Sequence, residues 1–193
     1  MKLFERIKAI ILTPAKEWGV IARERGGAMA VMADYLVYLA AIPAIADLIG
    51  MALIGFKLPN GARARVDVMS AIMAMVFDYV LAFAVVAGVA AIINLAAPFF
   101  GAGRNMTEAF RLSAYSYTPM LLSGIFLLIP GLHFLVILGL YGLFVLFKGM
   151  PVMIRTPAQN AFLFAGAITA CATVIVLIAG VVRARIFSLP GIL

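Results

Sequence analysis

The chain has 193 residues, of which 66% are hydrophobic and only 12% are charged, with a mean hydropathy of +1.16 and a formal charge of +7. Soluble domains hold about 45–50% apolar and about 25% charged residues, so this composition excludes an ordinary soluble domain and indicates an integral membrane protein. The 15 Lys and Arg lie in short stretches between apolar runs, which favours a role in membrane topology over nucleic-acid binding.

The first 27 residues predict an amphipathic arm on the membrane surface. The segment KLFERIKAIIL places apolar side chains at helical spacing, with charged side chains on the opposite face. A second short helix, PAKEWGVIARE, follows and carries the one tryptophan, a residue that favours the interfacial zone. The side chains that we expect to anchor the arm at the interface are Phe4, Ile7, Ile11 and Trp18. Docking of a soluble protein partner is the alternative role of the arm.

Five apolar segments meet or approach the length of about 20 residues that crosses a hydrocarbon core of about 30 Å. The predicted spans are residues 29–56, 70–99, 110–129, 132–149 and 160–182. The second is too long for a single perpendicular crossing, so we expect it either to tilt or to begin with an interfacial turn capped by Asp67. The sequence therefore predicts an all-α polytopic membrane protein, with an arm at 1–27 and a five-helix transmembrane domain at 28–193.

The loop charges predict the orientation of these spans. With the N-terminus inside, ten Lys and Arg lie on the cytoplasmic side and five lie outside. Basic residues favour the cytoplasmic side of a membrane. We therefore expect a multi-pass membrane protein with its N-terminus cytoplasmic and its C-terminus outside.

The third predicted span contains a polar stretch, Tyr115, Ser116, Tyr117, Thr118 and Pro119. Pro119 cannot donate to the carbonyl four residues back, so one backbone acceptor is freed inside the membrane. The stretch therefore predicts a kinked helix with a polar elbow that faces protein. After this span the short segment PGLH predicts a tight hairpin between the third and fourth spans.

Three carboxylates, Asp34, Asp47 and Asp78, fall within predicted spans, where a charge costs at least ~2.5–3.5 kcal/mol. No Lys or Arg lies deep in a predicted span. We therefore expect Asp47 and Asp78 to be neutral, to bond to Tyr, Ser, Asn94 or backbone, or to line a wet cavity or cation site. Asp34 lies near the cytoplasmic end of its span, and its expected partners are Arg23, Arg25 or Arg111.

The sequence contains no recognisable catalytic constellation. It has no P-loop, no GxGxxG opening a helix, no HExxH and no GxSxG. Cys171 and His133 are the only residues of their types, so a metal centre or hydrolytic triad has few candidate side chains. We expect a protein that is not an enzyme and that holds no cofactor.

Several segments together resemble the bacterial branch of the Yip family, five-span membrane proteins named for Ypt/Rab-interacting proteins. These are ILTPAKEW, YLVYLAAIPAIADLIG, LAAPFFGAGRNMTEAFRLSAYSYTPMLLSGIFLLIPGL and LYGLFVLFKGMPVMIRTPAQNA. The most specific residues are Ala114, Tyr115, Ser116, Thr118, Pro119, Tyr141, Gly142 and Leu143. The resemblance implies five spans, a cytoplasmic N-terminus, location in the bacterial cytoplasmic (inner) membrane, and an analogy with vesicle trafficking and membrane shaping. The arm is much shorter than the one through which eukaryotic members engage GTPases, which argues against GTPase binding here.

Two functional hypotheses follow. The first is a non-catalytic protein of membrane organisation, lipid handling or assembly of partner proteins. The second is a small channel, transporter or lipid scramblase that uses the intramembrane carboxylates. The expected partners are the lipid bilayer, a membrane or cytoplasmic protein, or a second copy of the chain, and nucleic acid is not expected. A polar cavity reaching Asp78 would favour transport, whereas carboxylates capped by Tyr or Ser in a dry bundle would favour a scaffold.

Overall fold

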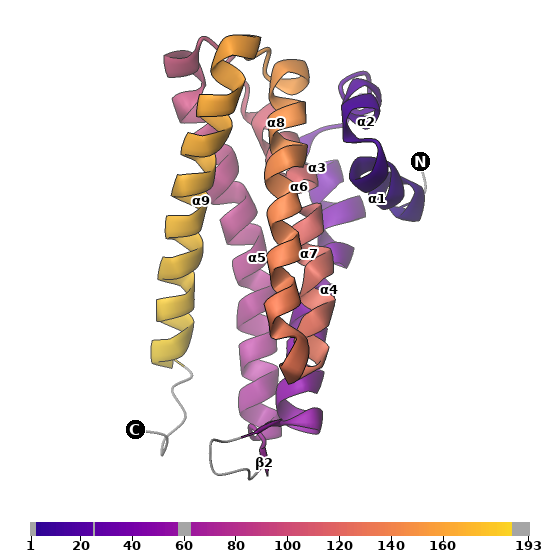
Figure 1. The fold of residues 1–193 in the computed structure, drawn as a ribbon, viewed down its shortest axis with the longest axis vertical. Helices are drawn as coiled ribbons and strands as arrows, with labels where there is room; N and C mark the ends of the chain where they lie inside the picture. Colours follow the sequence, from indigo (N-terminus) through magenta and orange to yellow (C-terminus); the bar gives the residue numbers. More distant parts are fainter. Residues whose placement is uncertain (1–2, 25, 58–62, 187–193) are drawn as a thin grey trace.

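The computed structural model describes residues 3–24, 26–57 and 63–186 as a helical bundle with an N-terminal arm at its side (Figure 1). The first elements are α1 (Leu3–Leu12), α2 (Pro14–Ile21), α3 (Ala28–Val31), η1 (Met32–Leu36), α4 (Val37–Leu48), η2 (Ile49–Ile54), β1 (Phe56–Lys57) and β2 (Arg63–Ala64). They are followed by α5 (Val68–Ala96), η3 (Ala97–Phe100), α6 (Met106–Ser116), α7 (Thr118–Ser123), η4 (Gly124–Leu128), η5 (Pro130–Leu140), α8 (Tyr141–Met153) and α9 (Ala158–Ile186). The two short strands pair antiparallel, Phe56 with Ala64.

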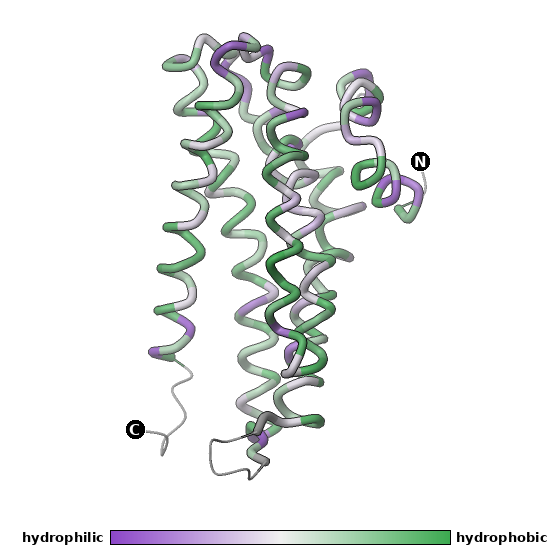
Figure 2. The backbone as a smooth tube through the Cα atoms, in the orientation of Figure 1, coloured by the Kyte–Doolittle hydropathy of each residue, from purple (hydrophilic) through white to green (hydrophobic). Residues whose placement is uncertain are grey.

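Among the described residues, four helical stretches are long and apolar enough to cross a membrane. They are Ala28–Ile54, Val68–Phe100, Gly131–Met153 and Ala158–Ile186. These stretches correspond to the first, second, fourth and fifth predicted spans. Figure 2 shows hydrophobic residues along the helices and hydrophilic ones gathered at the arm and at the ends of the bundle. The chain is therefore a multi-pass membrane protein.

The part of the chain predicted as the third span is divided into three short helices. α6 ends at Ser116, Tyr117 forms a turn, and α7 begins at Thr118 with Pro119 in its first turn. The break lies at the predicted elbow because Pro119 removes one helical N–H and favours the start of a helix. Since α6, α7 and η4 are separate, none of them alone has the length of a spanning helix.

The chain turns sharply between η4 and η5. Ile129 has an extended backbone, with φ −117° and ψ 107°, and its carbonyl accepts a hydrogen bond from the N–H of Leu132 at 2.8 Å. After this turn η5 packs against both η4 and α7. The approach is close at Gly139, where a Cβ atom would lie 2.9 Å from both Met120 Cα and Ser123 Oγ. Glycine is therefore required at this contact between α7 and η5.

The start of α5 confirms one sequence prediction. Asp67 is the N-cap, and its Oδ2 accepts a hydrogen bond from the Ser70 N–H at 3.0 Å. This bond lowers the pKa of Asp67, because it favours the ionised carboxylate. The cap ends the loop and fixes where the longest apolar helix begins.

The arm packs onto the bundle, which corrects the expectation for Trp18. This side chain is fully buried, and its Nε1–H donates to the Val145 carbonyl at 2.9 Å. Gly149 makes room for the ring, since a Cβ there would lie 2.5 Å from Trp18 Cε2. Trp18 is thus a contact between α2 and α8 rather than an interfacial anchor.

The other predicted anchor residues differ in exposure. Phe4 is 75% exposed and stays a candidate membrane contact. Ile7 and Ile11 are half-buried and pack against the core, and the Tyr141 hydroxyl donates to the Ile11 carbonyl at 2.8 Å. α1 therefore shares its apolar face between the bundle and the surroundings.

Candidate functional site

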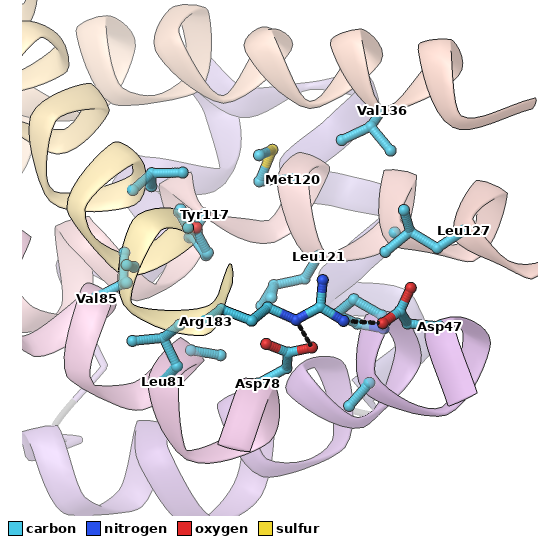
Figure 3. Close-up of a pocket in the computed structure, with 17 residues that line it drawn as sticks. Asp47, Asp78, Leu81, Val85, Tyr117, Met120, Leu121, Leu127, Val136 and Arg183 are labelled. Atoms are coloured by element: carbon cyan, nitrogen blue, oxygen red, sulfur yellow. Dashed lines mark hydrogen bonds and ion pairs between the residues drawn. The ribbon is translucent and has the colours of Figure 1, made fainter. Parts of the chain in front are cut away.

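The centre of the candidate site is an ion-pair cluster of Asp47, Asp78 and Arg183, contributed by α4, α5 and α9 (Figure 3). The Arg183 Nη2–H donates to Asp47 Oδ2, and Arg183 Nε lies 3.0 Å from Asp78 Oδ2. The exposed fractions of the three side chains are 13%, 23% and 34% for Asp47, Asp78 and Arg183, so both acids are mostly buried and Arg183 is about one third exposed. Residues 31 to 136 positions apart in the chain thus form one charged cluster.

This cluster corrects the expected partners of the two carboxylates. The sequence predicts neutral groups, bonds to Tyr, Ser, Asn94 or backbone, or a wet cavity or cation site, because Arg183 follows the predicted end of the last span at residue 182. α9 runs to Ile186, four residues beyond the predicted end of that span, and carries Arg183 in its last turn. Asn94 lies on α5, 16 residues and about 24 Å from Asp78, so the two cannot meet. The signal that could have revealed the pair is the basic residue just past an apolar helix.

A cavity of ≈ 300 Å³ extends from the cluster between α9 and the rest of the bundle. Its lining is largely apolar and includes Leu81, Val85, Met120, Leu127 and Val136 (Figure 3). The lining comes from α4, α5, α7, η4, η5 and α9, since these helices converge beside the elbow. The site is therefore an apolar space closed at one end by charges.

A second cavity of ≈ 270 Å³ adjoins the first along α9. The two share Tyr117, Met120 and Val176 in their linings, and we call them together the α9 groove. Val176 is 36% exposed and Gly180 is also exposed, so the groove opens to the outside beside α9. Exposed apolar side chains of α9 that line neither cavity flank it and suit contact with lipid: Val174, Ile178 and Val181.

Part of the elbow faces the α9 groove. Ser116 lines the second cavity, and its buried hydroxyl has no hydrogen-bond partner among the described residues. Tyr117 lines both cavities from the turn between α6 and α7. Pro119 is buried in the first turn of α7, the helix that follows these two residues. The predicted polar elbow therefore contributes two side chains to the groove.

The rest of the elbow faces the first long helix and the arm. The Thr118 and Tyr35 hydroxyls lie 2.7 Å apart, so Thr118 is engaged by a neighbouring helix. The ring of Tyr115 lies 4.7 Å from that of Tyr35 and 6.2 Å from that of Trp18, measured between centroids. The elbow therefore joins the α9 groove to the arm.

A further cavity, of ≈ 210 Å³ and more polar than the α9 groove, lies under the arm. Arg6 pairs there with Glu17 and Glu24, and its guanidinium lies 5.7 Å from the Tyr115 ring centroid. Burial disfavours the Arg6 charge, but the hydrogen bond to Glu24 and the neighbouring acids outweigh it and raise the Arg6 pKa. These ion pairs hold α1 against α2 and the turn that follows it, and the contact of Arg6 with the Tyr115 ring reaches the bundle.

Asp34 lines this cavity under the arm but is not joined to the predicted partners. Arg111, which lines the same cavity, lies 3.0 Å from Glu108 and donates a hydrogen bond to the Ile21 carbonyl. Within the described part of the chain Asp34 makes no ion pair, and Arg25 lies outside the described residues. Asp34 is therefore separate from the cluster of Asp47 and Asp78.

Comparison with protein families identifies the chain. The Yip1 domain model matches residues 8–180. The chain belongs to the Yip1 family. The match includes the elbow, Asp47 and Asp78, whereas Arg183 follows the last matched residue of the Yip1 domain. A search of curated proteins and a search of solved structures gave no match.

The Yip1 domain presents no evident metal site. In residues 3–24, 26–57 and 63–186 no group of three His, Cys, Asp or Glu could hold a metal ion. His133 is half-buried, and its Nε2 lies 3.3 Å from the Leu127 carbonyl oxygen. Cys171 is exposed on α9.

Proposed function

We propose that this Yip1-family protein is a non-catalytic lipid-handling protein of the bacterial cytoplasmic membrane. The observation that carries the proposal is the α9 groove, an apolar space that opens beside an outer helix and ends on charged side chains. A lipid has the matching form, since its chains are apolar and its headgroup is polar. A groove open at the side of a bundle can exchange such a molecule with the bilayer.

The proposal includes five crossings with a cytoplasmic N-terminus. The Gly103 N–H donates to the Ile154 carbonyl at 2.7 Å, so the chain before α6 and the chain after α8 lie at the same end of the bundle. Arg104 and Arg155 line one cavity there, together with Ala22 of the arm. The segment from α6 to η4 must then run from this end of the bundle to the opposite end, and η5 and α8 must run back to it. This arrangement supports an interrupted third crossing and a hairpin, and basic residues at this end favour the cytoplasmic side.

The alternative, ion transport on the carboxylates, has weaker support. Neither arrangement expected from the sequence is present, because Asp47 and Asp78 are paired with Arg183 rather than exposed in a polar path or capped by Tyr or Ser. The cavity lining is mainly apolar. An apolar groove offers few ligands to a hydrated ion but solvates a hydrocarbon chain.

Lipid binding can be tested by blocking the groove. Val176→Trp adds a large ring at the junction of the two cavities, whereas Val174→Trp adds the same ring on α9 at an exposed residue that lines neither. Mass spectrometry of the protein released from detergent should detect bound phospholipid in the wild type and in Val174→Trp. We expect Val176→Trp to lose most of it.

Two results would overturn the proposal. The first is a wild type that carries no more phospholipid than a detergent control, and the second is equal binding by Val176→Trp and Val174→Trp. Proteoliposomes test the transport alternative directly. A proton or cation flux present in the wild type and abolished by Asp78→Asn would replace lipid handling by transport.

A further inference from the structure

The charged end of the α9 groove carries an excess of negative charge. Among the described residues that line the first cavity, only Asp47, Asp78 and Arg183 are charged. When all three are ionised, two carboxylates face one guanidinium, so the cluster has a net charge of −1. Arg183 interacts with both acids and cannot neutralise both. A cationic group placed against the two carboxylates would offset this excess locally, even in a ligand whose total charge is zero.

The same cluster keeps free donor and acceptor atoms. Arg183 uses Nη2 for Asp47 and lies 3.0 Å from Asp78 through Nε, and Figure 3 shows the third guanidinium nitrogen directed into the cavity, with no partner among the residues drawn. Each carboxylate engages Arg183 through one oxygen, Oδ2, which leaves its other oxygen to accept hydrogen bonds. The site thus presents acceptors for a cation and a donor for an anion within one headgroup's reach.

The depth of the cluster suits a lipid headgroup. The 29 residues of α5 measure about 43 Å, which exceeds a hydrocarbon core of about 30 Å. With α5 centred on that core, Asp78 lies about 8 Å inside the boundary. Arg183, in the last turn of α9, lies close to the boundary by the same measure. A headgroup at the cluster would leave its acyl chains beside the apolar lining of the groove.

We propose that the cluster binds the headgroup of a zwitterionic phospholipid that bears a primary ammonium, as in phosphatidylethanolamine. The ammonium donates to the free oxygens of Asp47 and Asp78, the phosphate accepts from the free nitrogen of Arg183, and an acyl chain lies in the α9 groove. An anionic headgroup such as phosphatidylglycerol meets a net negative site. A quaternary ammonium such as that of phosphatidylcholine has no N–H to donate. This selectivity rests on the proposed lipid handling and specifies its ligand.

The inference can be tested by lipid competition on the detergent-solubilised full chain. Phosphatidylethanolamine, phosphatidylcholine and phosphatidylglycerol with identical acyl chains are mixed in equal amounts, and the bound lipids are counted by native mass spectrometry. We expect preference for phosphatidylethanolamine in the wild type and a fall of about tenfold in that preference in Asp47→Asn and in Asp78→Asn, since a hydrogen bond to a charged group is lost. Asp34→Asn is the matched control and should behave as the wild type, because Asp34 is exposed and lies outside the groove.

A second measurement uses only the wild type and so does not depend on the folding of any variant. Binding is compared across phosphatidylethanolamine and its mono-, di- and trimethylated forms, which lose one N–H donor at each step. Binding should fall along the series. Equal binding of all four, a preference for phosphatidylglycerol, or selectivity unchanged in both Asp variants would overturn the headgroup assignment. Loss of binding in Val176→Trp alongside such results would retain lipid handling without this selectivity.

Discussion

Tyr35 and Thr118 form a hydrogen bond that joins the first long helix to the elbow, and both side chains are buried. In Tyr35→Phe the Thr118 hydroxyl would lose its partner inside the bundle. An unsatisfied buried group costs about 1–3 kcal/mol, so we expect a lower unfolding temperature in detergent. Thermal unfolding followed by circular dichroism measures the change. Tyr38→Phe is the control, because Tyr38 is 59% exposed, and an equal effect of both substitutions would contradict this role of the Tyr35 hydroxyl.

The aspartates show what single residues reveal in a sequence. A carboxylate in an apolar run is costly, so the sequence identified Asp47 and Asp78 as groups that need a partner. It did not identify Arg183 as that partner, because the pairing depends on where α9 ends and on how closely it approaches α4 and α5. Charge and hydropathy show which residues need a hydrogen-bond or ion-pair partner, whereas the packing of the helices determines which residue is that partner.

The arm is the element whose environment the sequence predicted least well. Its helical periodicity is correct, since α1 and α2 both form. An amphipathic helix has an apolar face whether it rests on lipid or on protein, so periodicity alone could not tell the two apart. The space at Gly149 and the hydrogen bond from Trp18 to the Val145 carbonyl decide in favour of protein.

The lone tryptophan allows a direct test of this arm packing. Trp18 is fully buried, so its fluorescence should be blue-shifted and weakly quenched both by aqueous iodide and by lipids brominated near the headgroup. Gly149→Leu would exclude the ring from α8 and should increase quenching by at least one of these agents. Strong quenching of the wild-type signal by brominated lipid would instead favour an arm anchored at the interface.

The topology of the whole molecule can be tested with single cysteines in a Cys171→Ala background. If the chain crosses five times, Arg104→Cys and Arg155→Cys face the cytoplasm, and Arg65→Cys faces outside. A maleimide that cannot cross membranes should label Arg65→Cys in intact cells and the other two only after permeabilisation. Arg155 is the decisive position, because a chain that crosses only through the four long helices would place it outside. Labelling of Arg155→Cys in intact cells would therefore contradict five crossings.

The sequence by itself determined that this is an all-α multi-pass membrane protein, where its long helices lie, where α5 is capped and where the third segment breaks. These features depend on local composition, periodicity and the missing N–H of Pro119, all of which act over a few residues. Only the tertiary structure decided that Trp18 is buried on α8, that Arg183 joins Asp47 and Asp78, and that an apolar groove follows α9. Such contacts join residues more than 100 positions apart, and their formation depends on how whole helices pack, which no local pattern encodes.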